Sequence, residues 1–504
     1  MNVRLPATNE EAWGLASGWG AEREMNALEA FMWRAEASDA RMRSPVVVVE
    51  LLDSEPEWHR LRAAHKWASE LIPRVRMKVV DPPLQIQPPV WVEDDHFDLD
   101  YHLRRLRAPE PGTLRQVLDL AAQIAMTPFD RKRPPWEAFI VEGLEDGRAA
   151  YVVKVHHSAT DGLGGIQLMS LLHSRVREHS PKKPVGAGPS SPAPSSLTDA
   201  VDRLGRRLIM APTSAVRQLA NGAGAVRDMV ADPGGAASTA ARFGSSLQRV
   251  LSPPPAPPSA LLSGRSLNWR FDVIEVGLDE LKRAGKAAGG SLNDAYIAAV
   301  LGGIRLYHEA LGRSIEYLPM SMPLSLRTAE QPMGGNRFGG IRFAAPVGET
   351  DPVARIQSVR EFVLNARGEP AAMALGLIAP VLAALPARLT TDWYVAQSSR
   401  IDVQASNVAG LPHKVFLAGA EIERVYAFGP LPGCAAMTVL LSYSGTCFIG
   451  FNTDRAAVTD ADLFIECARL GLEEVLTHEP RQPPRRAHTS RRGQARAGER
   501  RRRR

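Results

Sequence analysis

The sequence predicts an α/β protein built from two halves, each of which combines strands and helices. Short Val-rich or alternating apolar runs, typical of strands, occur in both halves of the 504-residue chain. Between them lie segments whose apolar residues recur at helical spacing. Stretches crowded with Pro, Ser, Gly and Ala interrupt the middle of the chain. We therefore expect halves at residues 1–178 and 266–478, a crossover at 179–265 and a tail at 479–504.

The first half opens with an irregular lead-in over residues 1–24. The run PVVVVELL at Pro45–Leu52 predicts a buried strand, because β-branched side chains fit a pleated sheet. Leu114–Met126 has apolar residues at helical spacing and predicts an amphipathic helix. The run AAYVVKV at Ala149–Val155 predicts another strand.

The crossover is marked by two segments that cannot form packed elements. These are His179–Ser196, rich in Pro, Ser, Gly and Ala, and Ser252–Ser259, which reads SPPPAPPS. The Ala- and Arg-rich residues 197–250 between them predict loose surface helices. A long connection therefore separates the two halves.

The second half resumes the alternation of strands and helices from about Leu267 to Thr477. Apolar patterning predicts strands at Trp269–Val276, Ile341–Ala345 and Thr438–Tyr443, and helices at Leu278–Ala288 and Leu292–Leu311.

The composition is that of an ordinary globular protein, with 44% apolar and 23% charged residues. The uncharged stretch Pro370–Ala387 is interrupted by Pro380 and Pro386, so it predicts a buried helical pair rather than a membrane span. Glutamates near the N-terminus break any signal-peptide pattern, which predicts a cytoplasmic protein. The three cysteines have no metal-site spacing and predict free thiols in a reducing compartment: Cys434, Cys447 and Cys467.

The net charge of +6 comes from the tail. Residues 479–504 contain eleven Arg and two Glu, so they carry +9 and the rest of the chain carries −3. The tail has hardly any apolar residues and predicts disorder. The acidic body shows no basic face with interleaved aromatic residues, so we expect no nucleic-acid partner.

The stretch VHHSATDGLGG at Val155–Gly165 carries the chemistry. A strand ends in His156 and His157, Asp161 follows four residues later, and Gly162 opens a helix. A strand-to-helix corner can hold a catalytic side chain at the edge of a sheet. An imidazole suits the removal of a proton from an alcohol, because it titrates near neutrality.

Simpler interpretations of these residues stay open. Neighbouring histidines on a strand point to opposite faces, so His157 is the better candidate base and His156 is equally well explained as a packed support. We expect His157 at an exposed corner. Asp161 fits the N-cap of the following helix, and Ser291 with Asp294 has the spacing of a capping box.

The motif resembles HHxxxDG of the bacterial wax ester synthase/diacylglycerol acyltransferase family, within the wider group of chloramphenicol acetyltransferase-like folds. Peptide-synthetase condensation domains share this motif, but further stretches resemble the acyltransferases in the same order. These stretches are Pro89–Leu103, Arg133–Gly143, Ser291–Ala295, Pro323–Arg327, Gly335-Asn336 and Ser406–Gly410. Two departures are Pro134-Pro135-Trp136, where the family usually has Pro-Leu-Trp, and Asn26-Ala-Leu-Glu29, where Ser-Pro-Leu-Asp is usual.

The resemblance implies two chloramphenicol acetyltransferase-like halves, each a mixed sheet flanked by helices, with the active site between them. It implies that His157 takes the proton of a lipid alcohol, which then attacks the thioester of a long-chain acyl-CoA. The alcohol is diacylglycerol, a fatty alcohol, or both. In such folds Asp161 is a structural anchor paired with an arginine, for which Arg327 is the candidate. Asn293 and Asp294 match the family's Asn-Asp motif and support the site.

The resemblance implies no cofactor other than acyl-CoA as co-substrate, and no metal. Four alternating residues could look like metal ligands, but the resemblance makes them an ordinary strand and its flanks: His96, Asp98, Asp100 and His102. Because the substrates are lipids, we expect peripheral contact with membranes or lipid inclusions. Two alternatives remain, namely a condensation-type enzyme acting on carrier-bound acyl groups and a non-catalytic lipid-inclusion protein.

Overall fold

The computed structural model describes residues 18–82, 88–179, 256–325, 338–367 and 387–478, together with residues 16, 85, 335 and 336. Most of the lead-in and most of the crossover lie outside these residues, as do residues 370–386 of the stretch Pro370–Ala387, Arg327 and the tail.

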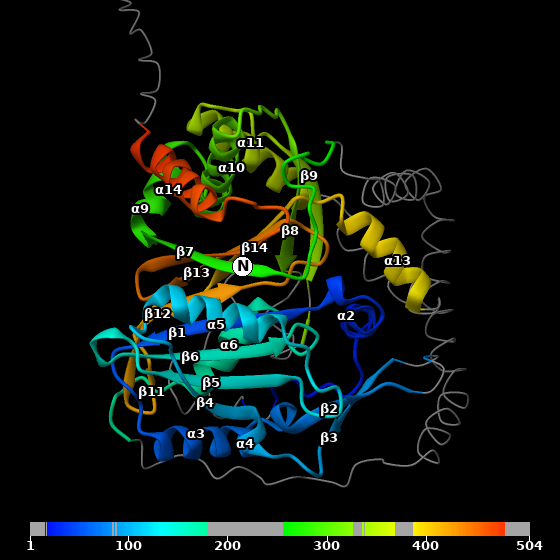
Figure 1. The fold of residues 1–504 in the computed structure, drawn as a ribbon, viewed down its shortest axis with the longest axis vertical. Coiled ribbons are helices and arrows are strands. Elements are labelled where there is room, and N and C mark those ends of the chain that lie inside the picture. The colour runs from blue at the N-terminus through cyan, green and yellow to red at the C-terminus, as the bar shows by residue number, and fades with distance from the viewer. Residues whose placement is uncertain are drawn as a thin grey trace, which may run out of the picture.

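Two six-stranded sheets lie one above the other (Figure 1). The first has the order β11-β12-β1-β6-β5-β4 and the second the order β7-β14-β13-β10-β8-β9. The strands of the first sheet are β1 Pro45–Leu52, β4 Leu103–Arg107, β5 Trp136–Glu142, β6 Ala149–His156, β11 Phe416–Leu417 and β12 Ala420–Phe428. Those of the second are β7 Trp269–Gly277, β8 Leu318–Ser325, β9 Phe338–Ala345, β10 Val403–Ala409, β13 Ala436–Tyr443 and β14 Thr446–Asp454.

Both sheets are mixed. In the first, β4 and β5 run parallel while β1 pairs antiparallel with β6 and β12. In the second, β10 is parallel to both β8 and β13, and β13, β14 and β7 are antiparallel neighbours. The predicted α/β fold of two mixed sheets flanked by helices is confirmed.

Helices cover the outer sides of the pair of sheets. Figure 1 shows α9, α10, α11 and α14 above the second sheet and α3 and α4 below the first. The helices are α2 Ala27–Ser38, α3 Trp58–Leu71, α4 Leu99–His102, α5 Leu114–Met126, α6 Gly162–Leu172, α9 Leu278–Ala287, α10 Leu292–Ala310, α11 Pro352–Arg367, α13 Ala387–Ser398 and α14 Ala461–Thr477. Short 3₁₀ turns occur at Ala40–Met42, Pro73–Arg76 and Glu145–Gly147, and β2 Met77–Val80 pairs with β3 Val90–Glu93.

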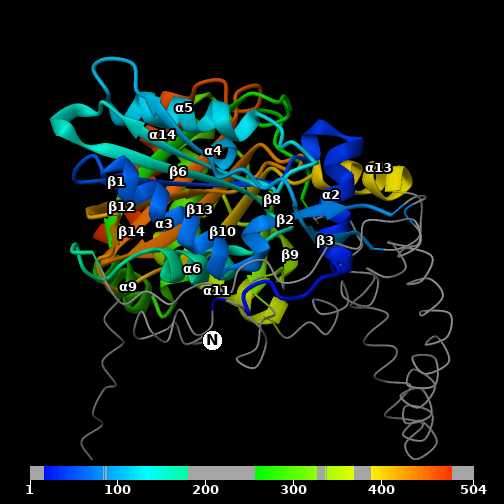
Figure 2. The ribbon, with the colours of Figure 1, turned by 90° about the horizontal axis from the view of Figure 1, so that it is seen from below.

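The second half of the sequence contributes two strands to the first sheet. Strands β11 and β12 come late in the sequence but pair within the first sheet, where Phe428 lies opposite Val47 of β1. The Phe428 ring also stacks on Phe271 of β7, with ring centroids 4.0 Å apart. Helix α13 of the second half packs beside α2 of the first (Figure 2). There the rings of Phe31 and Tyr394 meet edge to face. The predicted boundary at residue 266 therefore does not coincide with the division of the strands between the two sheets.

Close packing of α10 and α14 closes the top of the second sheet. A Cβ on Gly303 would lie 2.6 Å from the Cα of Ala468, so a larger residue there would push the helices apart. Residues along most of α10 are buried, which explains why its sequence is apolar on nearly every side.

One predicted element is wrong. Residues His96 to His102 do not form a strand, because Asp98 accepts a hydrogen bond from the backbone of Asp100 and begins the short helix α4. Within the described residues no group of three or more His, Cys, Asp or Glu could hold a metal ion.

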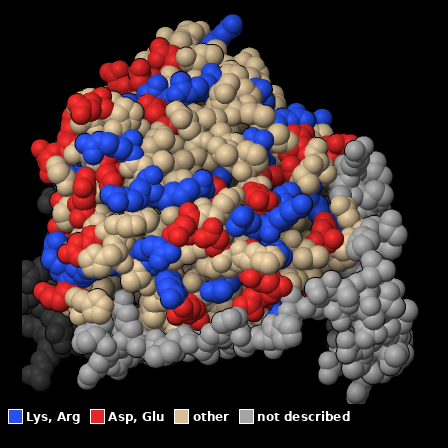
Figure 3. Space-filling view, turned by 60° about the horizontal axis from the view of Figure 1, so that its bottom comes forward, with Lys and Arg blue, Asp and Glu red and all other residues tan. Residues whose placement is uncertain are grey.

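No helix in the described part of the chain is long and apolar enough to cross a membrane. The three cysteines are buried and unbridged. On the face in Figure 3, basic and acidic side chains are interspersed.

Candidate active site

The HHxxxDG motif forms the corner between β6 and α6, as predicted. The His157 amide donates to the carbonyl of Ser44 at 2.7 Å, which ties the end of β6 to the start of β1. Asp161 is the N-cap of α6, and its carboxylate accepts from the backbone N–H of Gly164 at 2.8 Å. A carboxylate at this position accepts a hydrogen bond from an otherwise unpaired helix N–H, and its negative charge interacts favourably with the helix dipole.

The second half docks directly onto this corner. Thr160 forms an isolated bridge with Gly335, and the Asp161 amide donates to the Gly335 carbonyl at 3.1 Å. A Cβ on Gly162 would lie 2.9 Å from Cγ2 of Val408 in β10. Glycine is needed at position 162 because α6 begins where the two halves touch.

The His157 ring contacts Asn336, a residue of the second half. His157 Nδ1 lies 3.0 Å from Asn336 Oδ1, and the Asn336 side-chain N–H donates to the His157 backbone carbonyl. A carbonyl can only accept, so the Asn336 amide nitrogen must face it and the amide oxygen must face the ring. Nδ1 therefore carries the proton in neutral His157, and the basic lone pair is on Nε2.

The surroundings of His157 favour the neutral imidazole. Burial lowers its pKa, while its own backbone carbonyl, the Asp161 charge and the Asn336 hydrogen bond act in the opposite direction without cancelling the effect. The side chain is half-buried, so the expected exposed corner is wrong. A neutral imidazole at pH 7 can accept a proton.

His156 points away from His157 into a closed environment. Its Nε2 lies 2.8 Å from the Glu36 carboxylate and its Nδ1 lies 2.7 Å from the Ser158 hydroxyl. Its ring meets Trp33 and Phe129 edge to face, and the residue is 1% exposed. Of the two roles considered for His156, this geometry favours the packed support.

Asn293 and Asp294 lie at the start of α10. The Asp294 carboxylate accepts from the Ser291 amide and hydroxyl, each at 2.8 Å, so the predicted capping box is present. Asn293 Oδ1 accepts from the Asn407 side chain at 3.3 Å, next to the Val408 contact with Gly162. Asp294 is thus a capping residue, and Asn293 is linked to the corner through β10.

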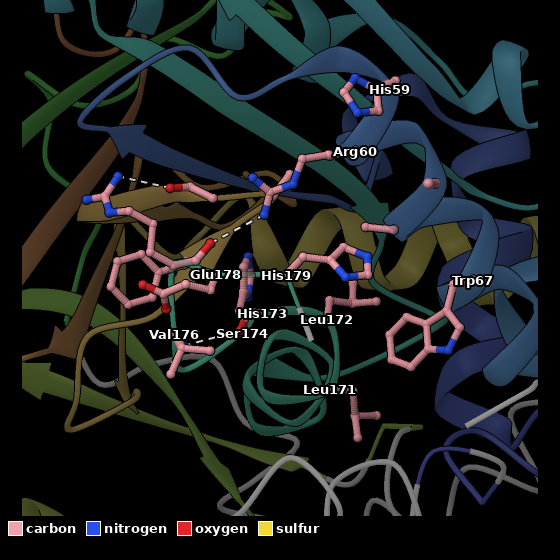
Figure 4. A pocket seen from close by; sticks show the side chains of 16 residues that line it. His59, Arg60, Trp67, Leu171, Leu172, His173, Ser174, Val176, Glu178 and His179 are labelled. Carbon is pink, nitrogen blue, oxygen red and sulfur yellow. Dashed lines mark hydrogen bonds between the residues drawn. The ribbon is translucent and has the colours of Figure 1, made fainter. Parts of the chain in front are cut away.

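A pocket of about 290 Å³ lies at the other end of α6, between α3 and β11 (Figure 4). The residues that line it include Arg60, Trp67, Leu172 and Phe416. Helix α6 has 11 residues and is therefore about 16 Å long, which places this pocket a helix length from Asp161. It is separate from the corner that carries the HHxxxDG motif.

The sequence alone indicates no role for Asn336, Asn26 or Glu29. Gly335-Asn336 resembles a pair found in the family, and Asn26-Ala-Leu-Glu29 departs from the family's usual residues. The N-cap spacing of Asn26 and Glu29 was the available signal, since an Asn followed three residues later by Glu can form a capping box.

Two family models cover most of the chain. The wax ester synthase/diacylglycerol acyltransferase catalytic domain matches residues 25–296, and the C-terminal domain of the same family matches residues 334–475. A Mycobacterium tuberculosis protein provisionally named a diacylglycerol O-acyltransferase is 42% identical over 456 residues, which cover 90% of this chain and 91% of that protein. A second such protein of the same organism is 27% identical over 470 residues, covering 90% and 97%.

Solved structures show the same fold. The wax ester synthase/diacylglycerol acyltransferase from Marinobacter aquaeolei aligns with a TM-score of 0.58 at 20% identity, covering 90% of this chain and 98% of that one. The first condensation domain of the CDA synthetase aligns with a TM-score of 0.55 at 14% identity, covering 91% and 97%. The family models and the 42% identical relative decide between these two groups. The chain belongs to the wax ester synthase/diacylglycerol acyltransferase family.

Proposed function

We propose that this protein is an O-acyltransferase that moves a long-chain acyl group from acyl-CoA to a lipid alcohol, with His157 as general base. The alcohol is diacylglycerol, giving triacylglycerol, or a fatty alcohol, giving a wax ester. The observation that carries the proposal is the hydrogen bond from His157 Nδ1 to Asn336 Oδ1, which leaves the basic lone pair on Nε2.

The reaction needs one group that takes a proton and then returns it. His157 Nε2 accepts the hydroxyl proton as the alcohol oxygen attacks the thioester carbonyl. The tetrahedral intermediate collapses to the ester, the carbon–sulfur bond breaks, and the imidazolium protonates the departing thiolate. Acyl-CoA and alcohol give ester and free coenzyme A, and His157 ends in its starting state.

Family membership supports the substrate class. The names of the Mycobacterium tuberculosis relatives refer to diacylglycerol as acceptor, and that of the Marinobacter protein refers to wax esters as well. Both acceptors are primary or secondary alcohols on apolar chains, so one base serves either. We propose that the protein meets them at the surface of membranes or lipid inclusions.

An acceptor panel tests the proposal. Purified protein is mixed with a long-chain acyl-CoA and diacylglycerol, a fatty alcohol or no acceptor, and both free thiol and ester are measured. We expect thiol release that depends on an acceptor, with an equal amount of ester formed. The matched control is His157→Gln. Thiol release without ester, or equal ester formation by His157→Gln, would show that the proposal is wrong.

A further inference from the structure

We propose that Asn336 is a positioning residue that sets the tautomer of His157, and that Asn26 and Glu29 at the start of α2 form the seat that holds it. The inference rests on the proposed role of His157 as base. It implies that the two halves must be docked before His157 presents the unprotonated Nε2 to the substrate.

Every polar group of Asn336 has a partner. Its amide donates to Glu29 Oε1 at 2.8 Å, and its carbonyl accepts from Asn26 Nδ2 at 2.9 Å. Its side chain bonds the backbone carbonyl and the ring Nδ1 of His157. The residue is 3% exposed, so each of these bonds would be costly to lose. Such a residue holds the ring in one orientation.

The two residues of the seat, Asn26 and Glu29, cap helix α2 and also bind the backbone of Asn336. Asn26 Oδ1 accepts from the Glu29 amide and Glu29 Oε2 accepts from the Asn26 amide, each at 3.0 Å, which is the capping box of α2. The remaining groups, Asn26 Nδ2 and Glu29 Oε1, point to the backbone of Asn336. One side chain supplies a donor and the other an acceptor, so together they match both backbone groups of a single residue.

A carboxylate is the group that position 29 needs. Two backbone N–H donors, from Asn26 and Asn336, converge on the two oxygens of Glu29. A carboxamide has one oxygen and one N–H₂, so Glu29→Gln would turn one of these bonds into a contact between two donors. Glu29 is 3% exposed. Burial raises the pKa of its carboxyl group, and the two N–H donors act in the opposite direction without cancelling the effect.

The seat also couples the halves. Asn26 and Glu29 belong to the first half and Asn336 to the second, while His157 lies between them on the corner after β6. The adjacent Gly335 carbonyl accepts from the Asp161 amide, so the same two-residue segment anchors the motif at both ends. Loss of docking would release the His157 ring without touching any residue of HHxxxDG.

The direct test is the tautomer itself. Long-range ¹H–¹⁵N spectra of ¹⁵N-histidine-labelled full-length protein show which ring nitrogen carries the proton, and His157→Gln identifies the His157 signals. We expect the Nδ1–H form in the wild type. Asn336→Ala and Glu29→Gln should give a mixture of the Nδ1–H and Nε2–H forms, because only the backbone carbonyl of His157 itself then favours Nδ1–H. Persistence of the Nδ1–H form in both variants would overturn the proposal.

Two further variants distinguish loss of the hydrogen bond to Asn336 from a general loss of stability. Asn26→Ser keeps a good N-cap for α2 but removes the donor to Asn336, so it should change the His157 signals in a folded protein. Thr113→Ala removes the equivalent capping box of α5, which has no contact with Asn336, and should leave those signals unchanged. Equal effects of the two variants on His157 would show that general destabilisation is the cause.

A kinetic test complements the spectra. Asn336→Asp places a negative charge beside His157 and should raise the imidazole pKa, so the acid limb of the kcat/KM–pH profile should move to higher pH. Turnover at neutral pH should fall by about 10²-fold, as expected for a misplaced catalytic group. An unshifted acid limb would contradict the positioning role. The spectra need no substrate, so they judge the seat even if acyl transfer is not the reaction.

Discussion

Asp161→Asn distinguishes a helix cap from an ion-pair anchor. The Asp161 carboxylate caps α6 through the Gly164 amide, and the residue is 7% exposed. Asparagine caps a helix about as well as aspartate, so this substitution keeps the cap and removes only the charge. Asp161→Ala removes both.

The magnitudes separate the two roles. If Asp161 forms a buried ion pair with Arg327, the candidate partner that the family resemblance implies, Asp161→Asn leaves one charge uncompensated and should cost about 3–5 kcal/mol. Asp161→Ala should add about 1 kcal/mol for the lost cap. If Asp161 acts only as a cap, the asparagine variant should stay within about 0.5 kcal/mol of the wild type.

Urea denaturation followed by circular dichroism measures these free energies of unfolding. Asp460→Asn is the matched control, because Asp460 caps α14 through the Leu463 amide at an exposed position and should be close to neutral. Arg327→Met and the double variant complete a thermodynamic cycle. A near-neutral Asp161→Asn, or strict additivity with Arg327→Met, would refute the ion pair.

The same substitution has a kinetic signature. The charge of Asp161 acts to raise the pKa of His157, so its removal should lower that pKa further. The acid limb of the kcat/KM–pH profile should then move to lower pH, opposite to the shift expected for Asn336→Asp.

The other predictions concern the base, a buried ion pair, the contact between halves and the tail. His157→Ala should lower acyl transfer by about 10²- to 10⁴-fold, and retention of more than half of the turnover would exclude it as the base. His173 is one of the residues that line the pocket in Figure 4. It lies 3.0 Å from Glu50, and both side chains are at most 3% exposed. Burial lowers the pKa of His173, but Glu50 outweighs it and raises that pKa overall. The pair's stabilisation is therefore complete below the unfolded pKa and is lost as pH rises through the folded one. His173→Gln should cost about 3–5 kcal/mol near pH 6 and less near pH 9, and a pH-independent loss would contradict this. Gly162→Ala should cost about 1–3 kcal/mol, measured by urea denaturation, because its Cβ would meet a β10 side chain at 2.9 Å. Deletion of residues 482–504 should leave turnover on detergent-dispersed substrate nearly unchanged. It should weaken sedimentation with anionic liposomes at low salt but not at high salt, and equal sedimentation at low salt would exclude a membrane tether.

Local patterns predicted the elements that local forces determine. Both ends of β1 and α5 agree with the prediction, because a Val-rich run and an amphipathic repeat are visible within the segments themselves. The stretch at 96–102 was misassigned, since its alternation resembled a strand while the Asp98 side chain capped a helical turn instead. The prediction therefore failed where a single side-chain hydrogen bond outweighed periodicity.

Local sequence patterns did not indicate which distant strands and residues contact each other. Nothing in the residues of β12 indicates that it pairs with β1 rather than with a strand of its own half. The contact of Asn336 with His157 joins positions 179 apart, and no periodicity connects them. The motif indicated the proposed base, His157, and the N-cap at Asp161, whereas Asn336, which we propose orients the His157 ring, was found only in the three-dimensional structure.

The corner that carries His157 is completed by the second half at three points. Asn336 holds the ring, the Gly335 carbonyl accepts from the Asp161 amide, and Val408 packs against Gly162 at the start of α6. These contacts stabilise the docking of the halves and also hold the proposed base, so the two properties depend on the same residues. A substitution that loosens the docking should therefore lower turnover before the sheets themselves unfold. The exchange of β11 and β12 into the first sheet opposes such loosening, because separating the halves would also require breaking the pairing of β12 with β1.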